Sequence, residues 1–243
     1  MTQDVAAPAG LAFAPARLLL REALTPRVSL FRFAVDWPAP HRAGQYVELR
    51  LTAADGYTAR RFYSIASPPS RPGTIDLMIA LAEDGEVSRF FHEVAEPGDA
   101  IDIRGPAGLP FSWGPEDGGP LLLVAGGSGL VPLLAMVRER ALAAPAVPAV
   151  LLHGARSRAE ALCLAELEAR AREEPGFDLV LALSRDGPGR RIDAGLMAEA
   201  LSRLPAPPRH TFVCGSAGFV SAAADLALDA GLPAGSIRTE RFG

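Results

Sequence analysis

The pattern of apolar residues in this chain changes at residues 112–120. This stretch, Ser-Trp-Gly-Pro-Glu-Asp-Gly-Gly-Pro, contains turn-forming residues and no apolar period, as is typical of a linker. With 243 residues, the chain is long for a single hydrophobic core and suits two domains of roughly 100 to 130 residues each. We therefore predict four parts: a flexible tail at 1–14, a first domain at 15–111, a linker at 112–120 and a second domain at 121–243.

The first domain has the sequence pattern of a small β-barrel. Short apolar runs are separated by Pro, Gly, Asp and Thr at strand-and-turn spacing, which predicts an antiparallel six-stranded barrel. The predicted strands are residues 16–22, 28–35, 45–51, 62–66, 75–80 and 100–104. One helix is predicted at residues 88–94, where Ser88 is well placed as the N-cap.

The second domain has the alternating pattern of an α/β fold. A continuous apolar strand at 121–125 is followed by a glycine loop and by a helix at 130–143, which has Pro132 in its first turn. The other predicted strands are 147–153, 178–183 and 211–214, and the other predicted helices are 159–172, 194–204 and 216–230. This alternation predicts a doubly wound parallel sheet, whose ligands bind outside the carboxyl ends of the strands.

Residues 60–67, Arg-Arg-Phe-Tyr-Ser-Ile-Ala-Ser, combine basic, aromatic and hydroxyl side chains in one predicted strand. Residues i and i+2 of a strand point to one face, so Arg61 can hold a phosphate while Tyr63 stacks on a ring such as a flavin, with Ser64 beside that ring. The helix N-terminus that follows Gly85 would suit a pyrophosphate. The structural alternatives are a half-buried strand with an exposed Arg and a core Tyr, and a plain capped helix.

Two glycine-containing motifs follow strands of the second domain. The first, Gly-Gly-Ser-Gly-Leu-Val-Pro at 126–132, lies between a strand and a helix but lacks the last glycine of the dinucleotide-binding fingerprint. It is therefore either a nucleotide-binding loop or a structural turn, and its position favours the first. The second motif, Cys-Gly-Ser-Ala-Gly-Phe-Val at 214–220, repeats this arrangement at a later strand end. Both ligands of a two-domain redox protein would meet there.

Composition argues against several classes of protein. The net charge of -4 gives no reason to expect nucleic acid or an anionic membrane as a partner, and no apolar run approaches the ~20 residues of a membrane span. The two cysteines are too few for an iron–sulfur cluster or a disulfide framework, and residues 1–10 lack the features of a signal peptide, so we expect a cytoplasmic protein. The four histidines show no ligand spacing, and we predict no metal site.

Six motifs, in order along the chain, resemble those of the ferredoxin–NADP reductase superfamily. They lie at residues 61–64 (Arg-Phe-Tyr-Ser), 85–88 (Gly-Glu-Val-Ser), 105–108 (Gly-Pro-Ala-Gly), 126–132, 214–219 and 240–242 (Glu-Arg-Phe). The resemblance covers nearly the whole chain beyond residue 15 and is to the bacterial oxygenase-reductase-like branch, without its ferredoxin domain. It implies a β-barrel domain that binds FAD, for which residues 105–108 are more typical than for FMN, followed by an NAD(P)-binding α/β domain.

The resemblance also implies roles for individual residues. Arg61 and the helix end at Val87 and Ser88 are expected to hold the flavin pyrophosphate, while Tyr63 stacks on the isoalloxazine and Ser64 lies near its reactive nitrogen. The predicted cofactor-binding residues are Arg61, Phe62, Tyr63, Ser64, Glu86, Val87, Ser88, Gly127, Ser128, Gly129, Pro132, Arg156, Ser157, Arg158, Cys214, Gly215 and Phe219. The predicted catalytic residues, which orient and polarise the reacting groups, are Ser64, Cys214, Glu240 and Phe242.

The preferred coenzyme is predicted from Arg-Ser-Arg at 156–158, just after the second strand of the second domain. NAD-binding proteins commonly place an acid near this point, whereas the 2′-phosphate of NADP favours Arg. We therefore predict NADPH, with NADH as a possible coenzyme; Glu160 is the competing acid, and the arginines could instead begin a solvated helix. Plant-type members stack a Tyr on the adenine, but this chain has Cys163 at that position, which we expect to be a buried core thiol.

The function implied by the resemblance is hydride transfer from NADPH or NADH to FAD, followed by single-electron transfer to an acceptor. The acceptor is expected to be a redox protein on a separate chain, such as a ferredoxin, a flavodoxin or an oxygenase component, because the four clustered cysteines of a ferredoxin domain are lacking. The alternatives are a non-catalytic flavin-binding subunit of a larger dehydrogenase, a free-flavin reductase, and a nucleotide-sensing module without redox activity. The intact glycine loop at 126–132 argues against the first of these.

Overall fold

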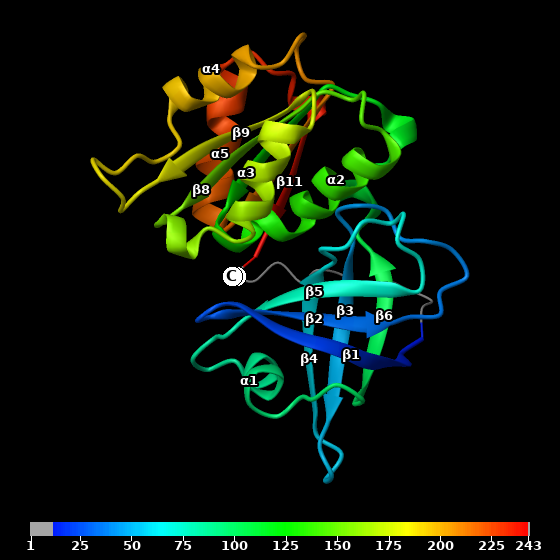
Figure 1. The fold of residues 1–243 in the computed structure, drawn as a ribbon. Helices are drawn as coiled ribbons and strands as arrows, with labels where there is room; N and C mark the ends of the chain where they lie inside the picture. Colours follow the sequence, from blue (N-terminus) through cyan, green and yellow to red (C-terminus); the bar gives the residue numbers. More distant parts are fainter. Residues whose placement is uncertain (1–11, 243) are drawn as a thin grey trace. The chain divides into compact units, whose positions relative to one another are not determined.

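The computed structural model describes residues 12–242, which form two compact units (Figure 1). The units divide between Ser112 and Trp113. Trp113 is fully buried, and its indole N–H donates a hydrogen bond to the carbonyl oxygen of Gly118 at 2.9 Å. The segment predicted as a linker is therefore folded, and it includes the short 3-10 helix η2 (Pro115–Asp117). Of the predicted tail, residues 1–11 lie outside the described residues.

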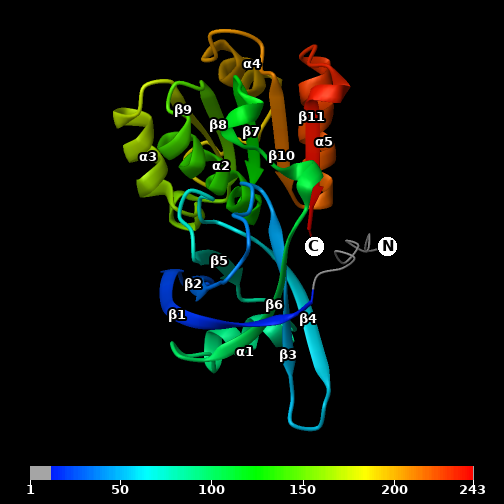
Figure 2. The same ribbon diagram turned by 90° about the vertical axis from the view of Figure 1, so that its right-hand side faces the viewer.

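The first unit is a six-stranded antiparallel barrel, which confirms the predicted architecture. Its strands are β1 (Ala14–Thr25), β2 (Val28–Ala34), β3 (Tyr46–Thr52), β4 (Thr58–Ser64), β5 (Thr74–Ala80) and β6 (Ala100–Ala107). They are hydrogen-bonded in the order β4-β3-β6-β1-β2-β5, and an isolated bridge between Ile65 and Leu77 joins the two ends of the sheet. Strand β4 begins at residue 58 and not at 62, because it pairs with β3 along the whole of a long hairpin (Figure 2).

Helix α1 (Glu86–Glu93) packs its apolar face against the core of this barrel. The ring of Phe91 is fully buried, with its centroid 5.1 Å from that of Phe31 and 6.1 Å from that of Phe33, both in edge-on contact. The strands contribute their inward-facing residues to the same core, among them Leu18, Val47, Leu49, Ile65, Ile75, Leu77 and Ile79. Because strand side chains alternate between the two faces, these residues form one cluster around Phe91.

The N-cap of α1 is Gly85, and not Ser88 as predicted. Ser88 lies inside the first turn, where its hydroxyl donates a hydrogen bond to the carbonyl oxygen of Gly85 at 2.9 Å and accepts one from the N–H of Ala82 at 3.1 Å. A Cβ atom at Gly85 would lie 2.4 Å from the Ser88 hydroxyl oxygen. Glycine therefore leaves room for a hydroxyl that bonds back to the preceding loop and does not cap the free N–H groups of the helix.

The second unit is a five-stranded parallel sheet with helices on both faces, which confirms the predicted doubly wound fold. Its strands are β7 (Leu121–Gly126), β8 (Ala149–Ala155), β9 (Phe177–Leu183), β10 (His210–Gly215) and β11 (Ile237–Arg241), in the order β11-β10-β7-β8-β9. Strand β11 is not predicted from the sequence. It lies at the sheet edge and pairs with β10, so its Ile-Arg-Thr-Glu-Arg composition lacks the apolar run of a central strand.

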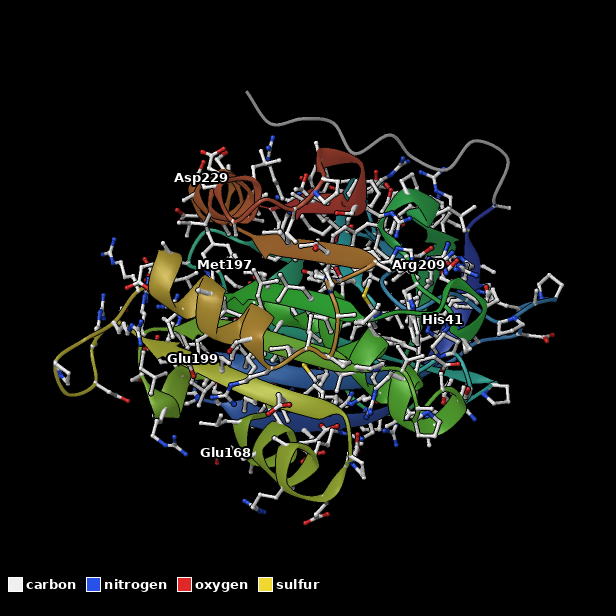
Figure 3. All side chains as sticks on the ribbon, turned by 90° about the horizontal axis from the view of Figure 1, so that it is seen from above. His41, Glu168, Met197, Glu199, Arg209 and Asp229 are labelled. Atoms are coloured by element: carbon white, nitrogen blue, oxygen red, sulfur yellow. The ribbon has the colours of Figure 1, made fainter. Side chains whose placement is uncertain are left out.

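Four helices cover this sheet: α2 (Leu130–Ala143), α3 (Leu164–Glu173), α4 (Ala194–Ser202) and α5 (Ala217–Asp229). Figure 3 shows α3 and α5 on opposite faces, and Met197 of α4 belongs to the core that α4 and α5 share. Helix α2 has the predicted bounds. Helix α3 starts at residue 164 and not at 159, because the chain first makes the 3-10 turn η4 (Arg158–Glu160) and Cys163 takes a left-handed conformation with φ of 52°. Cys163 is partly exposed, so the prediction of a buried core thiol is wrong.

Within residues 12–242, no helix is both long enough and apolar enough to cross a membrane. The same residues contain no group of three or more His, Cys, Asp or Glu side chains arranged to hold a metal ion.

Candidate functional site

Strand β4 and the residue before it carry Tyr57, Arg61 and Tyr63, which strand alternation brings to one face. Tyr63 is half-buried against the barrel core, and this burial raises the pKa of its hydroxyl to about 12, against the opposing charge of Arg61. The charge of Arg61 also acts to lower the pKa of the Tyr57 hydroxyl. The face for which the sequence predicts a flavin therefore holds one cation between two aromatic rings.

Arg61 is available to a ligand. Its side chain is exposed, its Nη1 donates a hydrogen bond to the carbonyl oxygen of Arg60 at 2.8 Å, and no carboxylate in the described part of the chain pairs with it. The guanidinium of Arg60 instead lies over the ring of Phe13, 5.5 Å from its centroid. The two consecutive arginines therefore have different surroundings, and Arg61 is the one on the Tyr63 side of the strand.

The N-terminus of α1 contacts β4. The hydroxyl of Tyr57 donates a hydrogen bond to Oε2 of Glu86 at 3.0 Å, and this bond raises the pKa of Tyr57. Val87 and Ser88 are buried, and the Ser88 hydroxyl is engaged with Ala82 and Gly85. The helix can therefore offer an anion its backbone N–H groups, but not the hydroxyl of Ser88.

Phe62 points to the opposite face of β4 from Arg61 and Tyr63. Its ring meets that of Tyr46 edge-on, with centroids 5.5 Å apart. Tyr46 in turn covers Gly108, where a Cβ atom would lie 2.7 Å from the Tyr46 ring. Ser64, at the end of β4, pairs with Tyr46 across the β3–β4 ladder. Of the predicted flavin residues, Arg61 and Tyr63 thus share one face, whereas Phe62 packs against a neighbouring strand.

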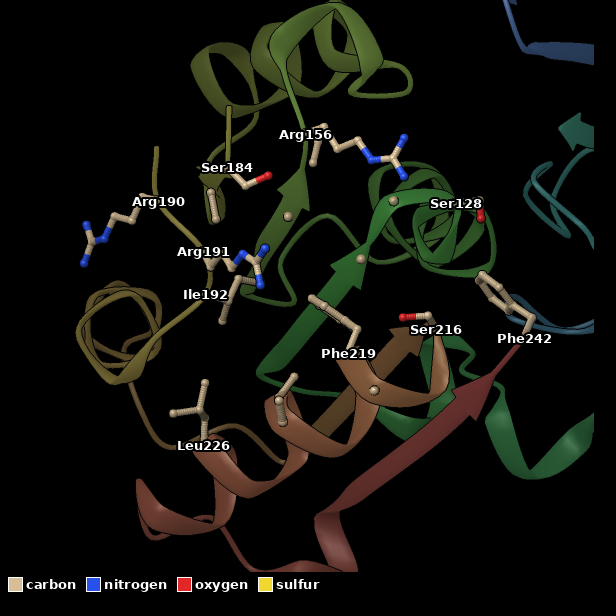
Figure 4. A pocket seen from close by; sticks show the side chains of 18 residues that line it. Ser128, Arg156, Ser184, Arg190, Arg191, Ile192, Ser216, Phe219, Leu226 and Phe242 are labelled. Carbon is tan, nitrogen blue, oxygen red and sulfur yellow. The ribbon is translucent and has the colours of Figure 1, made fainter. Parts of the chain in front are cut away.

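A cavity of about 760 Å³ opens at the carboxyl ends of β7, β8, β9 and β10 (Figure 4). It is lined by Gly126, Gly127, Ser128, Gly154, Ala155, Arg156, Ala182, Ser184, Arg190, Arg191, Ile192, Ser216, Gly218, Phe219, Ala222, Ala223, Leu226 and Phe242. Five of the predicted site residues therefore come together here, namely Gly127, Ser128, Arg156, Phe219 and Phe242. This is the edge at which doubly wound sheets bind their ligands.

The charged residues that line this cavity are all arginines, and no carboxylate is among the described lining residues. The guanidinium of Arg156 lies 3.6 Å from Glu160, and that of Arg190 lies 3.3 Å from Asp193. Arg191 makes no hydrogen bond or ion pair within residues 12–242, and Figure 4 shows it directed into the cavity while Arg190 points away. The cavity therefore holds an uncompensated cation, which suits a phosphate group.

The ring of Phe219 lies over glycines at the ends of β7 and β10. A Cβ atom would lie 2.6 Å from this ring at Gly126 and 2.7 Å from it at Gly215. Gly127 has a left-handed φ of 55° and open space around its Cα. Each alternative for the first glycine motif therefore fits one of its glycines. Gly126 is needed for close packing, as in a structural turn, whereas Gly127 is exposed in the cavity wall, as in a nucleotide-binding loop.

Cys214 and Glu240 lie opposite each other in the register of β10 and β11. Cys214 is fully buried, and this burial, together with the charge of Glu240, raises the pKa of its thiol. The thiol therefore stays protonated at neutral pH. Neither residue lines the cavity, but Phe242 does, and its N–H donates a hydrogen bond to the carbonyl oxygen of Gly215 at 3.1 Å.

Several residues predicted to bind the coenzyme lie outside the cavity. Gly129 and Pro132 are buried where α2 begins, and Ser157 is the N-cap of η4. The guanidinium of Arg158 pairs with Glu168 of α3 at 2.6 Å and is not among the residues that line the cavity. The physical reason is that η4 turns Arg158 toward α3, away from the strand ends.

The sequence prediction missed Ser184, Arg190 and Arg191, which the loop after β9 brings to the cavity. A signal was present in Gly-Pro-Gly-Arg-Arg at 187–191, two basic residues that follow a predicted strand. Because the carboxyl ends of parallel strands meet at one edge of a sheet, arginines after the third strand can reach the same ligand as arginines after the second.

The arginine–tyrosine strand of the barrel and the arginine-lined cavity of the parallel sheet together define a two-domain oxidoreductase, with one domain for a flavin and one for a nicotinamide nucleotide. Residues 15–111 match the oxidoreductase FAD-binding domain family, and residues 123–225 match the oxidoreductase NAD-binding domain family. The chain is also 36% identical over 209 residues to ferredoxin–NADP reductase B of Sorangium cellulosum, a match that covers 82% of this chain and 84% of that protein. It belongs to the ferredoxin–NADP reductase superfamily, and its cofactors are FAD and a nicotinamide adenine dinucleotide.

Two further comparisons agree with this assignment. Over 162 residues, the chain is 35% identical to the reductase component DmpP of a Pseudomonas phenol 2-monooxygenase, covering 67% of this chain and 45% of that protein. The chain thus spans about half the length of this relative. The crystal structure of the Amycolatopsis cytochrome P450 reductase GcoB matches with a TM-score of 0.80 and 26% identity, covering 96% of this chain and 70% of that chain.

Proposed function

We propose that this protein is a reductase that takes a hydride from NADPH onto FAD and passes electrons singly to a redox protein on a separate chain. Bound FAD supplies the conversion from two-electron to one-electron transfer. One relative is named a ferredoxin–NADP reductase and another the reductase component of a monooxygenase, which supports the proposal. The observation that carries it is the presence in one chain of the Arg61–Tyr63 face and the arginine-lined cavity.

The charges of the cavity support NADPH over NADH. A 2′-phosphate adds negative charge to the adenosine ribose, and a cavity whose charged lining residues are all arginines suits it. NAD-binding proteins of this fold commonly use an acid on the ribose hydroxyls. The competing acid, Glu160, does not line the cavity and lies 3.6 Å from Arg156. We assign the 2′-phosphate to Arg156 and Arg191, in place of the predicted triplet Arg156, Ser157 and Arg158.

The side chains of both units position the cofactors and need not exchange protons with them. Arg61 and the first N–H groups of α1 would hold the flavin pyrophosphate, and Tyr63 would pack on the ring system. Tyr63, whose pKa burial raises further to about 12, is protonated at neutral pH. The buried thiol of Cys214 also stays protonated, so it would act by contact and not as a nucleophile. Phe242, in the cavity wall, would lie against the nicotinamide.

The proposed acceptor is a ferredoxin, a flavodoxin or an oxygenase component, since the names of the relatives refer to a ferredoxin and to a monooxygenase. We also propose a cytoplasmic location, because the chain has only two cysteines, which suits a reducing compartment.

Anaerobic titration of the purified protein with NADPH and with NADH, followed by its visible spectrum, tests the proposed function. We expect a yellow protein that is bleached by a stoichiometric amount of NADPH, less readily by NADH, and that regains its colour when a ferredoxin is added. A protein that stays colourless after incubation with FAD would favour the nucleotide-sensing alternative. A yellow protein that neither coenzyme bleaches would favour the non-catalytic subunit, and one that passes electrons only to added flavin would favour the free-flavin reductase.

A further inference from the structure

Two neighbouring loops carry the arginines of the cavity: the loop after β8 holds Arg156, and the loop after β9 holds Arg191. One side chain joins these loops. Oδ2 of Asp186, in the loop after β9, accepts a hydrogen bond at 2.7 Å from the backbone N–H of Arg158, in the loop after β8. Asp186 does not line the cavity, so any effect it has on the position of the site's arginines comes through the loops that it joins.

Asp186 stands in a compact turn. Its carbonyl oxygen accepts a hydrogen bond from the N–H of Gly189 at 3.1 Å, and the N–H of Arg190 closes the turn on the carbonyl oxygen of Leu183 at 2.7 Å. Gly189 has a left-handed φ of 62°, and a Cβ atom there would lie 2.7 Å from the carbonyl oxygen of Ser184. These hydrogen bonds and the lack of space at Gly189 fix the backbone conformation of the turn. The turn leads directly to Arg190 and Arg191.

On the other loop, Asp186 supplies a cap that the local sequence does not. Arg158 is the first residue of η4, and the N-cap residue, Ser157, makes no side-chain cap hydrogen bond. The first N–H groups of a helical turn have no partner within that turn. The carboxylate of Asp186 satisfies one of them from across the gap between the loops. The backbone adds to this link, because the N–H of Arg185 donates a hydrogen bond to the carbonyl oxygen of Arg156 at 2.7 Å.

We propose that Asp186 is a positioning residue for the 2′-phosphate of NADPH, because its bond to the N–H of Arg158 holds together the two loops that carry Arg156 and Arg191. This inference rests on the coenzyme proposed above. A carboxylate near a phosphate would also repel it, so the two effects of Asp186 on NADPH have opposite signs. The oxygen of Asp186 is bonded to a backbone donor outside the cavity, which makes positioning the larger effect.

The test uses adenosine 2′,5′-bisphosphate and AMP, which differ by the 2′-phosphate alone, as ligands of the full-length flavoprotein. Isothermal titration calorimetry with both nucleotides measures binding without turnover. Asp186→Ala removes the acceptor and should weaken the bisphosphate roughly fivefold to tenfold, with AMP changed by less than about twofold. Asp186→Asn keeps an acceptor oxygen and removes the charge, so it should bind the bisphosphate at least as tightly as the wild type.

A second pair of variants removes the donor. Arg158→Pro lacks the N–H, suits the first position of a helical turn, and follows Ser157, whose ψ of 167° is compatible with a residue before proline. Its matched control, Arg158→Ala, loses the guanidinium and keeps the N–H. Only the proline variant should weaken the bisphosphate, and combining it with Asp186→Ala should add little. A melting curve shows whether Asp186→Ala is folded. If it is not, the two Arg158 variants test by themselves whether the bond between Asp186 and the N–H of Arg158 is needed to bind the bisphosphate.

The inference is overturned if Asp186→Ala binds the bisphosphate as well as or better than the wild type, because Asp186 would then be neutral or merely repulsive. It is also overturned if AMP weakens as much as the bisphosphate, because the residue would then only support the cavity. A wild type that does not prefer the bisphosphate to AMP rejects the assignment of NADPH and this inference together. A wild type with that preference, beside variants that keep it, rejects the inference alone.

Discussion

A Cβ atom at Gly129 would lie 2.1 Å from the carbonyl oxygen of Cys214. The start of α2 therefore packs directly against the end of β10, and both parts are backbone, which cannot move aside without disturbing the sheet. We expect Gly129→Ala to cost roughly 1 to 3 kcal/mol of the free energy of unfolding. Thermal unfolding measures this, with Gly218→Ala as the control, because a Cβ atom at Gly218 meets nothing within 4 Å. Equal melting temperatures for the two variants would contradict the close contact.

Arg61→Ala should release FAD more readily than the wild type. A charge-assisted contact with the pyrophosphate is worth about 1.5 to 3 kcal/mol, which is roughly a tenfold to hundredfold change in affinity. The matched control is Arg60→Ala, since Arg60 is the neighbouring residue and its guanidinium lies over Phe13. Flavin content after extensive dilution and gel filtration is the measurement. Full retention of flavin by Arg61→Ala would show that another group holds the pyrophosphate.

Arg191→Ala should lower the preference for NADPH over NADH. Arg191 has no ion-pair partner within residues 12–242 and points into the cavity, so its loss removes a contact of about 1.5 to 3 kcal/mol with the 2′-phosphate alone. The ratio of kcat/KM for the two coenzymes should fall roughly tenfold or more. Arg158→Ala, whose guanidinium pairs with Glu168, should leave this ratio unchanged. A fall in the Arg158 variant alone would assign the 2′-phosphate to Arg158 and not to Arg191.

Phe242→Ala should alter flavin reduction while the fold stays intact. The side chain of Phe242 lines the cavity, and its backbone bond to Gly215 does not depend on that side chain. We expect a changed rate of hydride transfer or a changed coenzyme affinity, with Phe242→Tyr close to the wild type because it keeps the ring. Stopped-flow reduction over a range of coenzyme concentrations separates the two effects. Identical traces for Phe242→Ala and the wild type at every concentration would place this ring outside the reaction.

His153 should make stability depend on pH. Its ring is fully buried and neither nitrogen makes a hydrogen bond within the described residues. Burial lowers its pKa to about 4 from an ordinary 6.5; the backbone of Ala125 opposes this shift without a hydrogen bond of normal geometry. Between about pH 7 and pH 4, His153 is therefore protonated in the unfolded chain and neutral in the folded chain. The free energy of unfolding decreases as pH falls over this range, by roughly 3 kcal/mol in all.

The variant His153→Leu isolates this contribution, because other groups titrate equally in both proteins. Urea unfolding of the two proteins at several pH values gives the difference in the free energy of unfolding. That difference should be nearly constant above pH 7 and should move in favour of the variant as pH decreases. A constant difference between pH 7 and 4 would mean that His153 is already protonated, or accessible to solvent, in the folded protein.

Much of the fold follows from patterns within short stretches of sequence. Alternating apolar residues place Arg61 and Tyr63 on one face of β4, and the apolar run at 121–125 followed by glycines and a helical pattern predicts β7 and α2. These features depend on residues within a few positions of one another, so the sequence alone predicts them. The same holds for the cavity edge, since alternating strands and helices imply a parallel sheet with its ligands at the carboxyl ends.

The tertiary structure decided which of several similar residues take part in the site. Arg158 and Arg191 both follow strands and both lie within two positions of another arginine, yet η4 turns the first toward Glu168 while the loop after β9 carries the second into the cavity. Sequence likewise marked Gly129 as a ligand-binding glycine, whereas its proximity to Cys214 shows that it is needed for packing. The packing of Gly129 against Cys214 and the placing of Arg156 and Arg191 in one cavity wall both join segments far apart in the chain. Local periodicity carries no information about such contacts, because they arise only when the sheet has brought separate strand ends together.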